Sequence, residues 1–137
     1  MKKLVYRTEL AFVMIWIPIV ILIFQLIPEK RIASVFAGIG FIFLPLAFIA
    51  FEFSKIKTGR TSLVHLGISI EFLFLSSLPI FLLRVMNWNS EFNNLELFGV
   101  SANSFHRFSN LNYMILIVST SYMAFKELRN EKSQPLG

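Results

Sequence analysis

The segment Leu10–Pro28, LAFVMIWIPIVILIFQLIP, holds nineteen residues without a single charge. The hydrocarbon core of a bilayer is about 30 Å thick, and a helix needs about 20 apolar residues to cross it. The segment therefore predicts a transmembrane helix over residues 10–28. Lys2, Lys3 and Arg7 precede it, as in a secretory signal peptide, but no small-residue cleavage site follows it. We interpret it as an uncleaved first helix.

Three further apolar segments follow, and they predict spans at about 32–52, 61–84 and 108–126, with an outer loop over 85–107. The composition agrees, because 55% of the residues are hydrophobic and only 15% are charged, against about 25% charged in soluble domains. The sequence predicts an all-α integral membrane protein with one membrane domain over 1–137. We expect a bundle of four transmembrane helices in up-down antiparallel order.

Lysine and arginine counts predict the orientation of the bundle. Nine of these residues lie in the N-terminus, the connection between the second and third spans, and the C-terminal tail, and four lie on the other side. Cytoplasmic loops carry the excess of positive charge, so both termini are predicted to be cytoplasmic. The expected location is a multi-pass position in a plasma membrane or a bacterial inner membrane.

Several kinds of chemistry are excluded by what the sequence lacks. It contains no cysteine, which excludes thiol chemistry and thiolate metal sites. No zinc-ligand cluster, phosphate loop or nucleophile elbow occurs, and no metal site or nucleic-acid partner is expected. In the outer loop, residues 90–100 are predicted to form a short interfacial helix with Phe92, Leu95 and Phe98 facing lipid.

Glu71 is the first candidate for chemistry, because it lies near the middle of the third predicted span. A charge there costs at least ~2.5–3.5 kcal/mol, so the side chain should face protein or water, or be protonated. Gly67 lies one turn earlier and is expected to let another backbone come close. Two interpretations stand: a site for a proton or a ligand head group, and a structural carboxylic acid bonded to a serine or threonine of the fourth span or to a partner subunit.

His65 lies about one turn inside the cytoplasmic edge, at a depth similar to that of Glu52, Ser119 and Tyr122. A packing histidine is preferred over a ligand there, because polar groups readily join membrane helices. The helical angle between His65 and Glu71 predicts different neighbours for the two. One haem held by both His65 and His106 is excluded by a predicted separation of roughly 20 Å or more, and the cofactor is otherwise left open.

A second polar group is predicted at the outer edge of the membrane: Arg84, His106, Arg107 and Asn110, with Gln25 nearby. It contains two arginines and no matching intramembrane acid. Such a group can bind an anionic lipid or a quinone-like carbonyl, although arginines at this depth more often extend to the head groups.

Small residues form one stripe along the second span: Ala33, Ala37, Gly40 and Ala47. Small residues allow close approach of helices, so the stripe predicts a packing face, either within the chain or towards another one.

The preferred function is a non-catalytic subunit or assembly partner of a larger membrane complex. The basis is that nearly all of the chain is in the bilayer, with little room for a separate catalytic domain. The alternative is a small transporter, channel or lipid- or quinone-binding membrane protein that uses Glu71, and an intramembrane enzyme ranks third. The expected partners are membrane lipids and either another membrane protein or further copies of the chain.

Overall fold

The computed structural model describes residues 5–133, and these are predominantly helical. Five α-helices follow one another along the chain: α1 (Val5–Leu26), α2 (Lys30–Lys55), α3 (Leu63–Phe72), α4 (Leu78–Met86) and α5 (Ala102–Lys132). A π-helical turn, Leu73–Ser77, joins α3 and α4 into one continuous helical segment. Pro79 lies in the first turn of α4, where its missing N–H removes one hydrogen bond of the preceding turn. A local widening of the helix accommodates this loss.

Three helical segments are long and apolar enough to cross a membrane. Within the described residues these are Val5–Leu26, Lys30–Thr58 and Leu63–Met86. Helix α5 has 31 residues, a length of about 46 Å, but its polar residues leave it outside this set. The three apolar spans are therefore supported, while the fourth long helix is of mixed polarity. It begins at Ala102, earlier than the start predicted for the fourth span.

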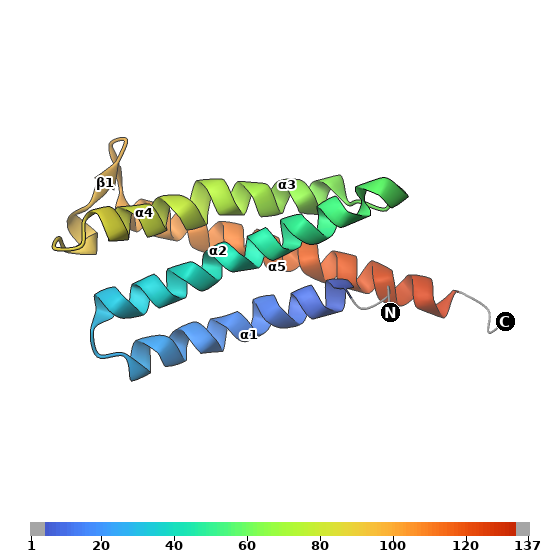
Figure 1. Ribbon diagram of the computed structural model, residues 1–137, viewed down its shortest axis with the longest axis horizontal. Helices are drawn as coiled ribbons and strands as arrows, with labels where there is room; N and C mark the ends of the chain where they lie inside the picture. Colours follow the sequence, from blue (N-terminus) through green and yellow to red (C-terminus); the bar gives the residue numbers. More distant parts are fainter. Residues whose placement is uncertain (1–4, 134–137) are drawn as a thin grey trace.

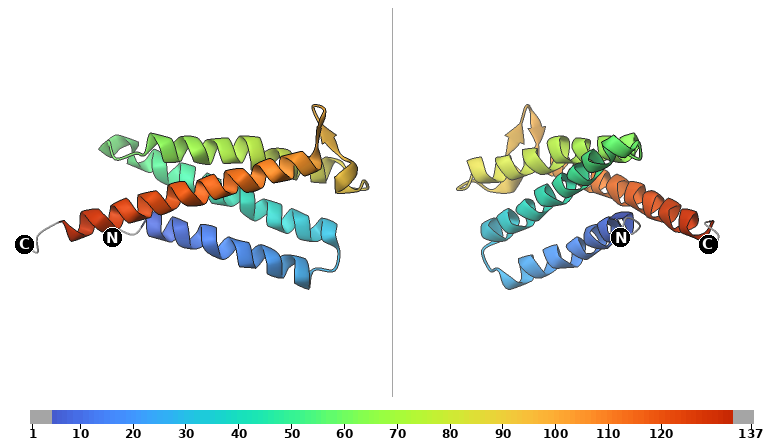
Figure 2. Two further views of the ribbon diagram at one scale, coloured as in Figure 1. Left: turned by 180° about the vertical axis from the view of Figure 1, so that it is seen from behind. Right: turned by 45° about the vertical axis from the view of Figure 1, so that its right-hand side comes forward.

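Successive helical segments run in opposite directions (Figure 1). Helix α5 packs against α1 and α3, while α2 packs against α1, α3 and α4. In the left view of Figure 2, which shows the bundle from behind, α5 crosses in front of the other helices. The start of α1 and the end of α5 lie at one end of the bundle, where Arg7 and Glu131 form an ion pair. We call this the termini end, and the opposite end the hairpin end.

The hairpin end corrects one prediction. In place of a short helix over 90–100, the chain forms a 3₁₀ turn, Phe92–Asn94, and an antiparallel pair of strands, β1 (Glu96–Leu97) and β2 (Val100–Ser101). Phe98 and Gly99 both have positive φ, 52° and 77°, which suits a two-residue hairpin turn and not a helix. Phe98 is 95% exposed, whereas Leu95 is buried and packs with Leu83 and Ala102.

The centre of the bundle is apolar. Val13, Phe48, Phe72, Tyr113 and Leu116 form its buried cluster. Large apolar side chains also cover the outside, and Phe43, for example, is 66% exposed. A soluble domain rarely exposes apolar patches of this extent, so the surface is suited to lipid.

Most residues of the small-residue stripe on α2 pack against other helices of the same chain. Ala33 and Ala37 are buried, and Gly40 contacts the indole ring of Trp16 so closely that a Cβ atom would lie 1.8 Å from its Cζ2. Ala47 is exposed and does not share this face. A 3.5-residue repeat drifts by about 20° per heptad on a straight α-helix, so the stripe turns away from its neighbours after two heptads.

Candidate functional site

A cavity of about 820 Å³ opens at the hairpin end. Its walls come from α1, α2, the segment of the π-helical turn and α4, the loop before β1, and α5. We call it the hairpin-end cavity. Its polar and charged lining residues are Lys30, Arg31, Ser34, Ser76, Ser77, Arg84, Ser90, Glu91, Asn93, His106, Ser109 and Asn110.

Three cations line this cavity and one acid accompanies them. Lys30 and Arg31 come from the first turn of α2, and Arg84 from the last turn of α4. The guanidinium carbon of Arg84 lies 4.8 Å from the centre of the Phe92 ring, which holds the side chain in place. Its Nε is buried and has no hydrogen-bond partner. Within residues 5–133 the ion pairs lie elsewhere, so this positive charge is not neutralised by Glu91.

The cavity also has apolar walls. Val20, Phe24, Ile80 and Phe81 form part of its wall. Tyr113 also lines the cavity, and its hydroxyl donates a hydrogen bond to the carbonyl of Val13 at 2.6 Å. The cavity therefore combines cationic, polar and apolar lining residues.

Of the four residues predicted to form a polar group at this end, three line the cavity. Arg84, His106 and Asn110 line the cavity, with Asn110 Nδ2 and His106 Nδ1 3.4 Å apart. Arg107 is exposed and does not line it. Lys30 and Arg31 were used only to predict orientation. The sequence did contain a signal for them, because they begin the second predicted span on the side of the membrane where the third span ends at Arg84.

Glu71 does not line the hairpin-end cavity. The amide nitrogen of the buried Asn112 donates hydrogen bonds to Glu71 Oε1 and to Ser76 Oγ, each at 2.8 Å. The partner is thus an asparagine of α5, where a serine or threonine was expected. Among residues 5–133, no atom from another helix lies within 4 Å of the Cβ position of Gly67, so the close approach of a second backbone expected there is not seen.

His65 is fully buried at the termini end between two side chains from distant parts of the sequence. Its Nδ1 lies 2.9 Å from Ser119 Oγ, and its Nε2 lies 3.0 Å from Glu9 Oε2. The ring stacks on Phe48 with a centroid separation of 5.7 Å. His65 contacts Ser119 and Glu9, whereas Glu71 contacts Asn112, so the two side chains have different partners, although both reach α5.

Glu52, also fully buried, fixes the backbone beside His65. It accepts hydrogen bonds from Tyr6 Oη at 2.6 Å and from the backbone N–H of Ser62 at 2.9 Å, and Lys55 Nζ lies 3.2 Å from it. This arrangement ties α1, α2 and the start of α3 together. Glu9 was missed as a site residue, because in the sequence it only marks where the first apolar run begins.

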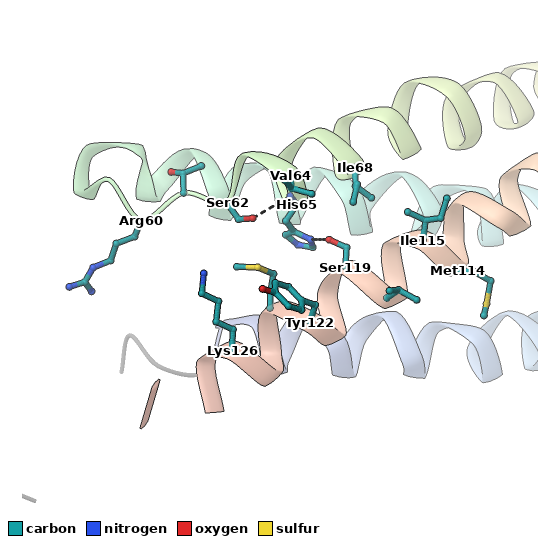
Figure 3. Close-up of a pocket in the computed structure, with 13 residues that line it drawn as sticks. Arg60, Ser62, Val64, His65, Ile68, Met114, Ile115, Ser119, Tyr122 and Lys126 are labelled. Atoms are coloured by element: carbon teal, nitrogen blue, oxygen red, sulfur yellow. Dashed lines mark hydrogen bonds between the residues drawn. The ribbon is translucent and has the colours of Figure 1, made fainter. Parts of the chain in front are cut away.

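A groove of about 690 Å³ runs between α3 and α5 beside His65. Figure 3 shows His65 directed at Ser119 across this groove, which we call the termini-end groove. Its wall is mainly apolar, with Val64, Ile68, Met114, Ile115 and Val118 among its residues. Arg60, Tyr122 and Lys126 also line it. Tyr122, a predicted site residue, is exposed there.

The two histidines line different cavities at opposite ends of the bundle. Within residues 5–133, no group of three or more His, Cys, Asp or Glu side chains is placed to hold a metal ion. Comparisons of the chain with protein-family models, with curated protein sequences and with solved structures find no match.

Proposed function

We propose that the chain is a multi-pass membrane protein that binds an anionic amphiphile in the hairpin-end cavity. The observation that carries this proposal is that Arg31 and Arg84 line one cavity together with apolar side chains, with the Nε of Arg84 buried and without a partner. The positive-inside bias places this cavity at the outer leaflet.

The chemistry of the cavity selects for charge at one end of the ligand. Guanidinium groups bind phosphate and carboxylate through paired, charge-assisted hydrogen bonds. With Lys30, Arg31 and Arg84 against Glu91, the cavity carries an excess of positive charge. The apolar lining residues, such as Val20, Phe24 and Phe81, then accept a hydrocarbon chain, and the volume lies within the usual range for small-molecule sites.

Extension of the arginines to lipid head groups outside the protein is the competing explanation. An arginine that does this keeps its charged end in the interface. Arg84 instead stacks on Phe92 and buries its Nε. Arg107, exposed at the same end, is the side chain that fits the competing explanation.

Binding is preferred here to the other two functions. The prediction of a subunit of a larger complex also assumed packing by the small-residue stripe, whose members Ala33, Ala37 and Gly40 lie inside the chain's own bundle. The case for transport rested on Glu71, which is bonded to Asn112. The apolar cluster at the centre of the bundle also lies between the two cavities. Assembly with another membrane protein stays a separate prediction.

The test measures lipid retained by the purified chain. The protein is exposed in detergent to equal amounts of phosphatidylglycerol and phosphatidylcholine with the same acyl chains, and bound lipid is counted by native mass spectrometry. Wild type should retain the anionic lipid preferentially. Arg31→Gln combined with Arg84→Gln should reduce that preference about tenfold or more, because each charge-assisted hydrogen bond contributes about 1.5–3 kcal/mol.

Arg107→Gln is the control, because it removes one positive charge at the same end without touching the cavity. It should retain the preference of wild type. An equal loss in the control, or an undiminished preference in the double variant, would overturn the proposal.

A further inference from the structure

The termini-end groove contains a chain of hydrogen-bonding side chains that the binding function does not use. Ser119, His65 and Glu9 come from α5, α3 and α1, and they are joined at 2.9 Å and 3.0 Å. His65 and Glu9 are buried, while Ser119 is half-buried and lines the groove together with His65. A hydroxyl, an imidazole and a carboxylate in this order are the components of an activated nucleophile.

The carboxylate decides which ring nitrogen of His65 carries the hydrogen. When Glu9 is ionised it can only accept a hydrogen bond, and His65 Nε2 then donates to it. In the neutral ring Nδ1 then has a lone pair and accepts from the hydroxyl of Ser119. This is the arrangement in which the imidazole can take the proton of the serine.

The ring is also held in position by its surroundings. Phe48 stacks on one face, and Tyr6 lies edge-on at 5.8 Å. The backbone N–H of His65 bonds to the capping Ser62, and its carbonyl accepts from Ser69. Fixed geometry of this kind is what a general base requires.

The groove defines the class of substrate. Val64, Ile68, Met114 and Val118 provide an apolar wall for a hydrocarbon chain, and Arg60 and Lys126 provide positive charge. Lys126 lies about two helical turns beyond Ser119, about 10 Å along the axis. An amphiphile with an anionic group about this far from an ester carbonyl matches both features.

We infer that the termini-end groove is a second, catalytic site, in which Ser119 hydrolyses carboxylic esters of anionic lipids. Ser119 Oγ attacks the ester carbonyl while its proton passes to His65 Nδ1. The bond from the carbonyl carbon to the alkoxy oxygen breaks, and His65 returns the proton to the leaving alcohol.

Water then attacks the acyl-serine, giving its proton to His65, and the acyl–Oγ bond breaks. The fatty acid leaves and Ser119 recovers its proton, so the overall reaction is ester plus water to acid plus alcohol. Glu9 acts as a positioning residue through His65. Tyr122, one turn from Ser119 on α5, and the hydroxyl of Ser62 are the neutral donors available to the oxyanion (Figure 3).

The first test is covalent labelling of the full chain in detergent with a long-chain alkyl fluorophosphonate, followed by intact-protein and peptide mass spectrometry. Wild type should gain one adduct at Ser119, and Ser119→Ala should gain none. Ser121→Ala is the control, because Ser121 is a half-buried serine of the same helix that does not line the groove. It should label as wild type does. An unlabelled wild type, or equal labelling of Ser119→Ala, would overturn the assignment.

The second test measures the reaction. Wild type should release fatty acid from phosphatidylglycerol vesicles, and Ser119→Ala should not. Combining Arg60→Gln with Lys126→Gln should slow release from phosphatidylglycerol more than release from phosphatidylcholine. A labelled protein that releases no acid would refute the substrate class.

Glu9→Gln tests the positioning role. Its amide can donate to Nε2, which would place the ring hydrogen on Nδ1 and remove the base. Labelling should fall roughly a hundredfold, and the ¹⁵N NMR shifts of the ring should show the exchanged tautomer while the melting temperature stays near that of wild type. Labelling at the wild-type rate would remove Glu9 from the mechanism. None of these variants touches the hairpin-end cavity, so the result is independent of the binding proposal.

Discussion

Replacing Gly40 with alanine adds one methyl group at a close contact between α1 and α2. The new Cβ would lie 1.8 Å from Trp16 Cζ2 and 2.2 Å from its Cη2, where ordinary contacts begin at 3.4 Å. The indole cannot simply turn away, because it packs edge-to-face on Phe41 at a centroid distance of 6.1 Å. Either the ring leaves Phe41 or the two helices separate.

The expected loss follows from this overlap. Inserting a methyl group into a well-packed contact costs about 1–3 kcal/mol, which corresponds to a fall of about 3–12 °C in melting temperature for a chain of this size. Thermal melts of the purified protein in detergent, followed by circular dichroism, measure it directly. Combining Gly40→Ala with Trp16→Leu should restore much of the loss, because the colliding ring atoms are gone.

Gly67→Ala is the matched control for this experiment. Gly67 is also a helical glycine, but nothing lies within 4 Å of its Cβ position. Alanine should leave stability unchanged or raise it by up to about 1 kcal/mol. A melting temperature of Gly40→Ala equal to that of wild type, or an equal fall in Gly67→Ala, would refute the contact.

Two further predictions follow from the polar bonds and from the charge distribution. Glu71→Gln should have the melting temperature of wild type, because its Oε1 still accepts a hydrogen bond from Asn112. Glu71→Leu should lose about 1 kcal/mol of unfolding free energy. Equal melting temperatures of the two variants would contradict a structural role for Glu71. Reporter fusions at Gly137 and within residues 87–103 should report opposite sides of the membrane, with Gly137 cytoplasmic, and matching answers would contradict the orientation.

The sequence alone determined the character of the helices. Long uncharged runs predicted three apolar segments that the structure also has, at Val5–Leu26, Lys30–Thr58 and Leu63–Met86. The depth of a residue in the membrane could also be predicted, because each residue advances a helix by about 1.5 Å. Counting along the spans therefore put His65 and Ser119 at comparable depth, and they are hydrogen-bonded. The short helix predicted over residues 90–100 was wrong, because Phe98 and Gly99 have positive φ, which a right-handed helix does not allow.

Only the tertiary structure decided which side chains meet. Glu9 and His65 are 56 positions apart in the chain, and His65 and Ser119 are 54 apart. Their contact depends on how each helix is rotated about its own axis. That rotation is set by packing between helices, such as Gly40 against Trp16, and not by the period of any one of them. The same holds for Arg31 and Arg84, which line one cavity although the sequence shows them only as membrane-edge residues.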